Sequence, residues 1–356
     1  MGVDTMHVRH AMTAAGRRLP GLTRLRVVLI GWVLVYHLEL ALHALNGTAA
    51  FEAVAMRGYL GVDGFFLLSG FALVLGYAHR PPRGIGGWAR FVRDRLARVM
   101  PMHLVLLAAL VLLVGAAAAT GIAVNNPERF GLRELVFQAV LLHAWETTRE
   151  HAWNYPSWAL SAILAGYLAF PALLSVAMRL SRGALWMVVA ASFAGLAVLG
   201  AMNPWLGLNH TLHFGMVRFG LEFLAGMALA RLVAGQGLSR QIATAGLLLI
   251  PVGLGFGHDV LVVAGLAALV VRAALAAPAE APPRDLAHRL GEASFGIYLS
   301  WVFVEAGLVL LLRLADPGLA ARQGLMVAGL AATFLAGWIA WRVIEVPAAA
   351  WLSRGR

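Results

Sequence analysis

The sequence contains no cysteine and no lysine, and only 13% of its 356 residues are charged. Without cysteine, the chain can form no disulfide bond and offers neither a thiolate nucleophile nor a thiolate metal ligand. Hydrophobic residues make up 61% of the chain, well above the roughly 45–50% of soluble globular domains. This composition excludes a soluble enzyme and a disordered chain. It indicates a protein that crosses a membrane several times.

The lack of lysine means that the formal charge of +11 is carried by 28 arginines. Together with abundant alanine and glycine, this usage indicates a bacterial source with a biased genome rather than a nucleic-acid-binding protein. The arginines are therefore interpreted by their positions relative to the apolar segments.

Ten apolar stretches are long enough to span a bilayer. The first follows a basic N-terminal stretch and has no convincing cleavage site, so we expect a retained helix rather than a signal peptide. The ten predicted spans are residues 27–45, 58–77, 102–119, 158–178, 183–202, 211–233, 242–256, 259–276, 293–312 and 324–343. An eleventh candidate, residues 132–145, is shorter than the roughly 17 residues that a perpendicular helix needs.

The arginines decide whether residues 132–145 cross the membrane. If this segment does not cross, 20 arginines lie on the cytoplasmic side and six lie outside, whereas a crossing gives 13 on each side. The six external ones would be Arg57, Arg129, Arg133, Arg149, Arg313 and Arg322. The positive-inside rule thus favours an all-α protein with about ten transmembrane helices and both termini in the cytoplasm.

This topology predicts a long external segment at 120–157, with a re-entrant or surface helix in it. We expect a single transmembrane domain over residues 21–352. It would lie between a basic cytoplasmic segment, residues 1–20, and a cytoplasmic tail, residues 353–356. The predicted location is the bacterial inner (plasma) membrane.

Ionisable side chains within the predicted spans are candidates for function, because a charge at the bilayer centre costs about 2.5–3.5 kcal/mol. In the first span, Arg26 and His37 are eleven residues apart, which is about 16 Å along a helix. Neutral imidazole is cheap to bury and titrates near working pH, so His37 is a candidate general base. It could equally be a structural histidine bonded to a neighbouring helix. Glu39 lies in the same span.

In the second span, Asp63 could pair with His37, Arg57 or a substrate hydroxyl, or be a charge at the helix end. Arg95 and Arg98 are three residues apart and share one helix face, where they could bind phosphates. The alternative is an ordinary basic loop beside anionic lipid headgroups.

The sixth predicted span carries Arg218 and Glu222, four residues apart. Their spacing predicts an ion pair along one helix. This pair could be structural or part of a site.

Five sequence blocks occur in an order that resembles the integral membrane proteins of acyltransferase family 3. The blocks are Arg26 and His37 with ten residues between them; Gly61 to Phe71, with Asp63 and Ser69; the pair Arg95 and Arg98; Asn154 to Ser161; and Leu290 to Leu299 with Ile344 to Pro347. The resemblance covers residues 20 to 352. It implies an acyltransferase of groups other than aminoacyl groups.

The resemblance implies transfer of an acyl group, acetyl in the first instance, from cytoplasmic acyl-CoA to a hydroxyl of a cell-surface carbohydrate or lipid-linked glycan. The O-acetylation of polysaccharides is a reaction of this kind. The implied donor site is formed by Arg26, Arg95 and Arg98. His37 would act as general base, and Asp63 or Glu39 would orient it. No metal and no nucleic acid are expected.

Two positions depart from the family pattern. Ile163 stands where a glutamate is common, and Trp301 stands where a histidine is common. These departures keep open a catalytically inactive relative with a binding role. The buried charges leave open a transporter or flippase, although the sequence has no inverted repeat. Because the chain ends at Arg356, we expect no appended soluble hydrolase-like domain.

Overall fold

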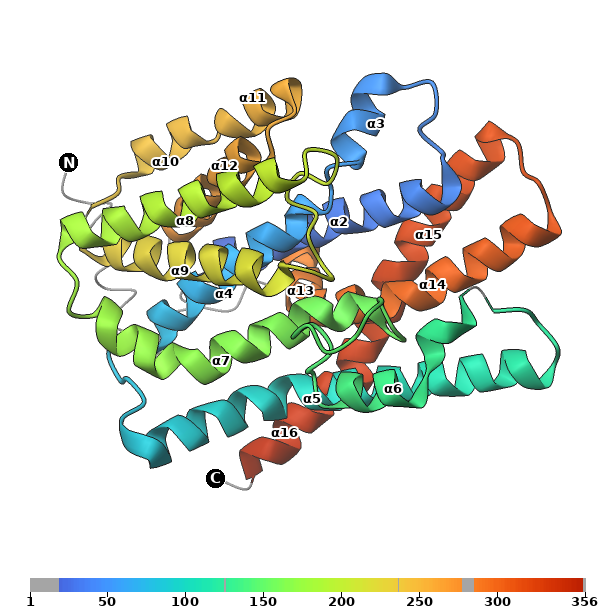
Figure 1. The fold of residues 1–356 in the computed structure, drawn as a ribbon, viewed down its shortest axis with the longest axis horizontal. Coiled ribbons are helices and arrows are strands. Elements are labelled where there is room, and N and C mark those ends of the chain that lie inside the picture. Colours follow the sequence, from blue (N-terminus) through green and yellow to red (C-terminus); the bar gives the residue numbers. More distant parts are fainter. Residues whose placement is uncertain (1–18, 125, 236, 277–284, 355–356) are drawn as a thin grey trace.

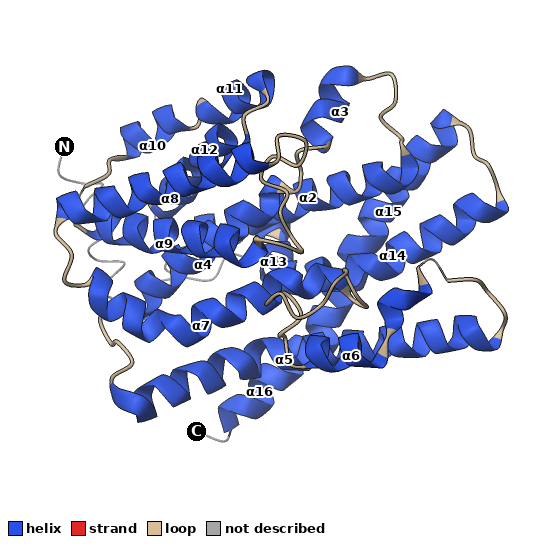
Figure 2. Cartoon of the chain, viewed as in Figure 1, coloured by secondary structure: helices blue, strands red, loops and turns tan. Residues whose placement is uncertain are grey.

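All regular structure in the described part of the chain is helical. The computed structural model describes residues 19–124, 126–235, 237–276 and 285–354, and Figure 2 shows helices and loops throughout these ranges. The chain is therefore an all-α polytopic membrane protein, as predicted. Most of the predicted basic segment at 1–20, and the end of the predicted tail, lie outside the described residues.

Nine long helices form the body of the molecule. They are α2 (Pro20–Leu42), α4 (Leu60–Tyr77), α5 (Gly84–Ala119), α7 (Trp158–Ala177), α8 (Arg182–Met202), α9 (Gly215–Ala234), α12 (Asp259–Ala274), α14 (Ser294–Leu314) and α15 (Leu319–Ala340). Shorter helices connect them: α3 (Ala49–Ala55), α6 (Leu132–Ala139), α10 (Arg240–Gly246), α11 (Leu249–Phe256), α13 (Leu286–Glu292) and α16 (Val346–Arg354). Three further single turns are η1 (Pro127–Phe130), η2 (Tyr155–Ser157) and η3 (Trp341–Glu345), of which η3 is a π-turn. These counts refer to the described ranges.

Seven segments of the described chain are long and apolar enough to cross a bilayer. They contain α2, α4, α5, α7, α8, α14 and α15. The other three predicted spans correspond to α9, which carries Arg218, Glu222 and Arg231; to the pair α10 and α11, two short helices; and to α12, which has 16 residues. The number of ten transmembrane helices stays a prediction.

The third predicted span begins earlier than the hydropathy pattern indicates. α5 is one continuous helix from Gly84, with Pro101 in its interior. The predicted helix face of Arg95 and Arg98 is therefore confirmed, and the alternative of a basic loop before residue 102 is not found. The proline ring removes one backbone donor but does not end the helix here. As a result, the arginines of the third sequence block lie on a helix face.

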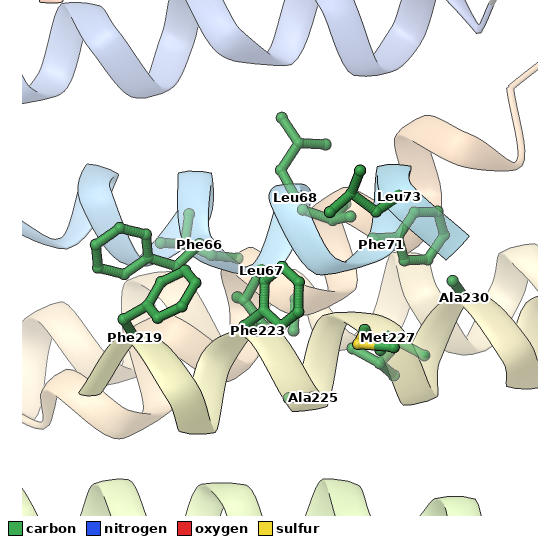
Figure 3. Close-up of a cluster of buried hydrophobic side chains, with 14 of the residues drawn as sticks. Phe66, Leu67, Leu68, Phe71, Leu73, Phe219, Phe223, Ala225, Met227 and Ala230 are labelled. Atoms are coloured by element: carbon green, nitrogen blue, oxygen red, sulfur yellow. The ribbon is translucent and has the colours of Figure 1, made fainter. Parts of the chain in front are cut away.

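Helix α4 lies in the interior of the bundle, where it packs against α2, α7, α9 and α12. Gly70 on α4 and Gly226 on α9 face each other so closely that a side chain at either would clash with the opposite backbone. Such small residues allow close helix packing in membranes. Figure 3 shows buried side chains of the two helices packed together, with Phe66 of α4 beside Phe219 of α9.

The remaining helices surround this central pair. In Figure 1, α5, α7, α9 and α8 run side by side, α12 with α10 and α11 covers one flank, and α14 pairs with α15 on the other. Many large apolar side chains on the outer helices are exposed, including Leu112, Val198 and Val327. An exposed apolar surface of this kind is expected of helices that face lipid.

The segment at 120–157, where a re-entrant or surface helix was predicted, contains the short helix α6 and folds back onto α5 and α7. Buried Gln138 donates from Nε2 to the backbone oxygen of Asn154 and to Oγ of Ser157. Its own backbone oxygen bonds with Nε2 of His103 on α5 at 2.8 Å. The fourth sequence block, Asn154 to Ser161, therefore has a structural role, because its hydrogen bonds with Gln138 hold the segment at 120–157 against the start of α7. This set of contacts is here called the clasp.

Candidate functional site

Two adjacent cavities lie between α2, α4, α7 and α14. The first, here the Arg26 cavity, has a volume of about 160 Å³, and most of its wall is apolar. The second, here the His37 cavity, has a volume of about 220 Å³ and is lined largely by polar and aromatic side chains. Val62 and Tyr298 line both cavities. The two cavities therefore adjoin at these two side chains.

His37 lies on α2 with its ring held on two sides. Its Nδ1 is 3.2 Å from the hydroxyl of Tyr155. The imidazole also stacks on Trp301, with ring centroids 4.0 Å apart and an angle of 22° between the planes. Nε2 has no hydrogen-bond partner among the described residues, and the side chain lines the His37 cavity. This geometry leaves one ring nitrogen available to a ligand in the cavity.

The lining of the His37 cavity also includes residues of the segment at 120–157 and of the loop before α9. His151 Nε2 bonds with Oγ1 of Thr211 at 2.9 Å. Asn209 Nδ2 donates to the hydroxyl of Tyr36 at 3.0 Å. Burial, together with the nearby charge of Arg129, lowers the pKa of His151 from 6.5 to about 4. The ring of His151 is therefore neutral at neutral pH.

Asp63 pairs with Arg218, and no contact joins it to His37 or Arg57 in the described structure. The Arg218 guanidinium donates from Nε to Oδ1 at 2.9 Å and from Nη2 to Oδ2, and both side chains are fully buried. Arg57 pairs instead with Asp259 at 3.4 Å. Neither sequence expectation for an Asp63 pair is met, because α9 brings a buried cation alongside α4.

The predicted pair of Arg218 and Glu222 is present at a longer distance. Nε of Arg218 lies 3.8 Å from Oε1 of Glu222. Both Glu222 oxygens are buried without a hydrogen-bond partner in the described chain. Arg218 also lines the His37 cavity. The ion pair with Asp63 thus holds a cationic side chain, with its charge balanced, at the edge of this cavity.

Glu39 is buried at the end of α2, away from the described contacts of His37. Its Oε2 accepts a hydrogen bond from the backbone N–H of Leu45 at 3.0 Å, so it stabilises the turn that leaves the helix. Neither predicted orienting carboxylate therefore contacts His37. The group that does so is Tyr155, which sequence reasoning did not single out, although it lies inside the fourth block.

The three predicted donor-binding arginines lie on two helices. Arg26 is on α2, towards the end of the helix opposite Glu39, and Arg95 and Arg98 are on α5. Arg26 lines the Arg26 cavity, and Arg98 is exposed on α5. Electrostatic interactions connect Arg26 with Tyr167, Arg98, Glu345 and Glu292. The structure therefore brings Arg26 and Arg98 into one charged group with two carboxylates, one from the π-turn η3 and one from α13.

Arg95 is bound more tightly to the protein than Arg98. Its Nη2 donates to the hydroxyl of Tyr77 at 2.9 Å, and its guanidinium lies over the rings of Tyr77 and Phe91. Its Nε is buried without a partner in the described chain. The two arginines of the block are thus not equivalent, because part of the Arg95 side chain is used in packing.

Both departures from the family pattern lie at the cavities. Ile163 lines the Arg26 cavity, and Trp301 stacks on His37. Tyr298, three residues before Trp301 on α14, borders both cavities. Sequence spacing alone did not identify Tyr298, because its position depends on how α14 packs against α2, α5 and η2.

Comparison with known proteins gives one family and one relative. The sequence profile of the acyltransferase domain of family 3 matches residues 19–342. Acyltransferase MdmB of Streptomyces mycarofaciens is 32% identical over 179 residues, which are 49% of this chain and 43% of that protein. The chain thus spans less than half the length of this relative. No solved structure matches the chain.

Proposed function

The chain belongs to acyltransferase family 3, and on this premise we propose that it is a membrane acyltransferase. It would move an acyl group, acetyl in the first instance, from acyl-CoA to a hydroxyl of a cell-surface carbohydrate or lipid-linked glycan. The observation that carries the proposal is the pair of adjacent cavities, one reached by Arg26 and the other by His37. Both residues lie on the continuous helix α2, about 16 Å apart along its axis.

The Arg26 cavity suits the donor. Arg98 and Arg26 offer cationic donors for the phosphates of coenzyme A, with Arg95 behind them. The mainly apolar wall beyond Arg26 suits the pantetheine arm and the acyl group, which have few charges to satisfy. The thioester would then lie near Val62 and Tyr298, where the two cavities adjoin.

The His37 cavity suits a neutral, hydroxylated acceptor. Its wall contains hydroxyl, amide and imidazole groups from Tyr36, Tyr59, Asn209, Thr211 and His151, together with the aromatic face of Trp158. Sugars present hydroxyls to such polar groups and C–H faces to aromatic rings. The charge of Arg218 is balanced by Asp63, so the cavity has no excess charge that would require an ionic acceptor.

The proposed reaction is a direct transfer. Nε2 of His37 takes the proton of the acceptor hydroxyl as its oxygen attacks the thioester carbonyl. The carbon–sulfur bond then breaks, and the coenzyme A thiolate takes the proton from His37. An ester and coenzyme A are formed, and no proton is left over.

The topology required by this function has the arginine end of α2 in the cytoplasm of a bacterial cell, at the inner membrane. Reporter fusions in the loops at Arg182 and Arg240 should therefore give cytoplasmic signals, and fusions within 120–157 should give external ones. External signals at both arginines would place the donor site on the wrong side and contradict the proposal.

The central experiment measures coenzyme A release and label transfer from [acetyl-¹⁴C]acetyl-CoA with detergent-solubilised protein, in which the donor side and the acceptor side are both accessible. Release should depend on His37 and on an added glycan acceptor. Movement of a labelled glycan across the membrane of sealed vesicles, with no release of coenzyme A, would instead indicate a flippase. Donor binding without any transfer would indicate an inactive relative, and Ile163→Glu should then recover transfer if the missing glutamate is the cause.

A further inference from the structure

The hydroxyl of Tyr155 is the one hydrogen-bond partner of the His37 ring in the described structure. The distance from Tyr155 Oη to His37 Nδ1 is 3.2 Å. Tyr155 belongs to η2, which Asn154 fixes by donating from Nδ2 to the backbone oxygen of Leu299 at 3.1 Å. The tyrosine is thus held from two sides, by the clasp of the fourth block and by α14.

The direction of this hydrogen bond decides what His37 can do. In a neutral imidazole only one nitrogen carries a proton, and the bond made by one nitrogen sets the state of the other. If the tyrosine hydroxyl donated to Nδ1, the proton would be on Nε2, and the nitrogen in the cavity could not accept another. A base at Nε2 therefore requires Nδ1–H to donate to the oxygen of Tyr155.

We propose that Tyr155 is the positioning residue for His37: its phenolic oxygen accepts a hydrogen bond from Nδ1–H and keeps Nε2 unprotonated toward the acceptor. The inference rests on the proposed role of His37 as the base. In this arrangement tyrosine has the part that a carboxylate has in a Ser-His-Asp triad. The same bond stabilises the imidazolium formed when His37 takes the proton. The stack on Trp301 fixes the plane of the ring.

The surroundings of His37 make a clear pH measurement possible. The titratable or charged side chains that face its cavity are Tyr36 on its own helix, Tyr59 at the start of α4, His151, Tyr155, Arg218 on α9 and Tyr298 on α14, and Glu305 and Arg129 interact electrostatically with Tyr155. Arg218 is paired with Asp63. His151, with a pKa of about 4, stays neutral through the neutral range.

Tyr36 provides a matched control for Tyr155. Both tyrosine rings meet the His37 ring edge-on, with centroids 4.9 Å apart for Tyr36 and 5.9 Å for Tyr155. The Tyr36 hydroxyl, however, bonds with Asn209 rather than with His37. Changing either tyrosine to phenylalanine removes one hydroxyl from the same cavity, but only Tyr155→Phe removes the partner of Nδ1.

The first test is the nitrogen-15 NMR spectrum of histidine-labelled protein in bilayers, with His37→Gln used to identify the His37 signals among the 12 histidines. We expect a protonated Nδ1 and an unprotonated Nε2 in the wild type and in Tyr36→Phe. In Tyr155→Phe the proton should move wholly or partly to Nε2. A wild-type His37 with its proton on Nε2, or a Tyr155→Phe spectrum identical to the wild type, would overturn the proposal.

The second test is the pH profile of kcat with acetyl-CoA as the probe donor. Tyr155→Phe should lower kcat by about 10- to 100-fold, the effect of losing one hydrogen bond to a charged group. The KM for acetyl-CoA should stay the same, and the acid limb should move to lower pH because the imidazolium loses its acceptor. Tyr36→Phe should keep the acid limb of the wild type. An unchanged kcat and acid limb in Tyr155→Phe would contradict the proposal.

The two tests separate the inference from the proposed function. A wild type that transfers nothing contradicts the function, whereas the NMR spectra still decide the Tyr155 bond. Glu305→Gln is the further control. If this substitution, rather than Tyr155→Phe, moves the acid limb, the limb belongs to Glu305 and the positioning role is overturned.

Discussion

The Arg26 cavity and the His37 cavity differ in how their polar groups are held. Around the His37 cavity, most polar side chains bond to one another: His37 with Tyr155, His151 with Thr211, Tyr36 with Asn209 and Arg218 with Asp63. Arg26, which lines the other cavity, makes no hydrogen bond in the described structure, and Arg98, which interacts with it electrostatically from α5, is exposed. Fixed polar groups suit a reacting centre, because their orientation is set before the reaction. Guanidinium groups that no hydrogen bond holds in place suit the binding of a mobile phosphate chain.

The largest effect on the rate of transfer is expected at the His37 cavity, where the proposed reaction takes place. His37→Ala should slow transfer by about 10²–10⁴-fold, the usual effect of removing a general base, while the protein stays folded and binds donor. Single-turnover transfer and thermal unfolding are measured on the same detergent-solubilised sample. His258→Ala, an exposed histidine before α12, is the control. A stable, fully active His37→Ala protein would exclude the mechanism, and a loss of stability alone would make the histidine structural.

The second prediction tests what fixes Arg218 at the His37 cavity. Asp63→Ala leaves a fully buried guanidinium without its main partner and should destabilise the protein by about 3–5 kcal/mol. Arg24→Ala is the contrast, because Arg24 pairs with Asp285 at the surface, where such pairs contribute little. Thermal unfolding in one detergent compares the two variants. Equal shifts in melting temperature would mean that burial does not distinguish the two ion pairs.

At the Arg26 cavity, the two arginines of α5 should behave differently. Arg98→Ala should raise the KM for acetyl-CoA by about 10- to 100-fold without loss of stability, because one charge-assisted phosphate contact is lost. Arg95→Ala should raise the KM and also lower the melting temperature, since Arg95 bonds with Tyr77. Arg93→Ala, which changes an exposed arginine of the same helix, should alter neither. If the double variant Arg95→Ala, Arg98→Ala is folded and its affinity for acetyl-CoA is unchanged, the two arginines do not bind the donor and serve only to set the membrane topology.

The smallest expected effect concerns the wall of the His37 cavity and depends on pH. The folded pKa of His151 is lowered from 6.5 to about 4, first by burial and then by Arg129. The unfolded chain therefore binds more protons between these values, so stability is complete above pH 6.5 and falls as the pH approaches 4. His151→Asn should reduce this fall by about 1–2 kcal/mol, measured by unfolding at pH 7 and pH 4.5. The same pH dependence in both proteins would show that His151 stays accessible to protons.

Much of the fold follows from patterns that are local in the sequence. Long apolar runs predicted the membrane-crossing helices, and the short, charged stretch at 132–145 was correctly excluded from the long helices, since the structure has only the short helix α6 there. The predicted span at 102–119 is only the second half of α5, because the arginines before residue 102 lower the hydropathy without preventing a helix. Hydropathy indicates which part of a helix can face lipid. The length of the helix also depends on packing, here of α5 against α7 and α14.

The candidate site was predictable only in part. The spacing of Arg26 and His37 on one helix is a property of the sequence, and α2 is continuous between them. The partners of Asp63 and His37 were not predictable, because Arg218 and Tyr155 are separated from them by more than a hundred residues. Glu39 was predicted to lie beside His37 because the two residues are close in the sequence. Residues two positions apart on a helix, however, point their side chains in different directions.

The sequence by itself determined that this is an all-α membrane protein with charged and ionisable groups at defined depths along its first helices, and its ordered blocks identified the family. Those properties depend on composition and on the fixed rise of a helix, which need no neighbours. Tertiary structure alone decided that Tyr155 bonds to His37, that Asp63 pairs with Arg218, and that Val62 and Tyr298 line two adjacent cavities. Each of these contacts joins helices that are distant in the chain, so it exists only once the helices have packed.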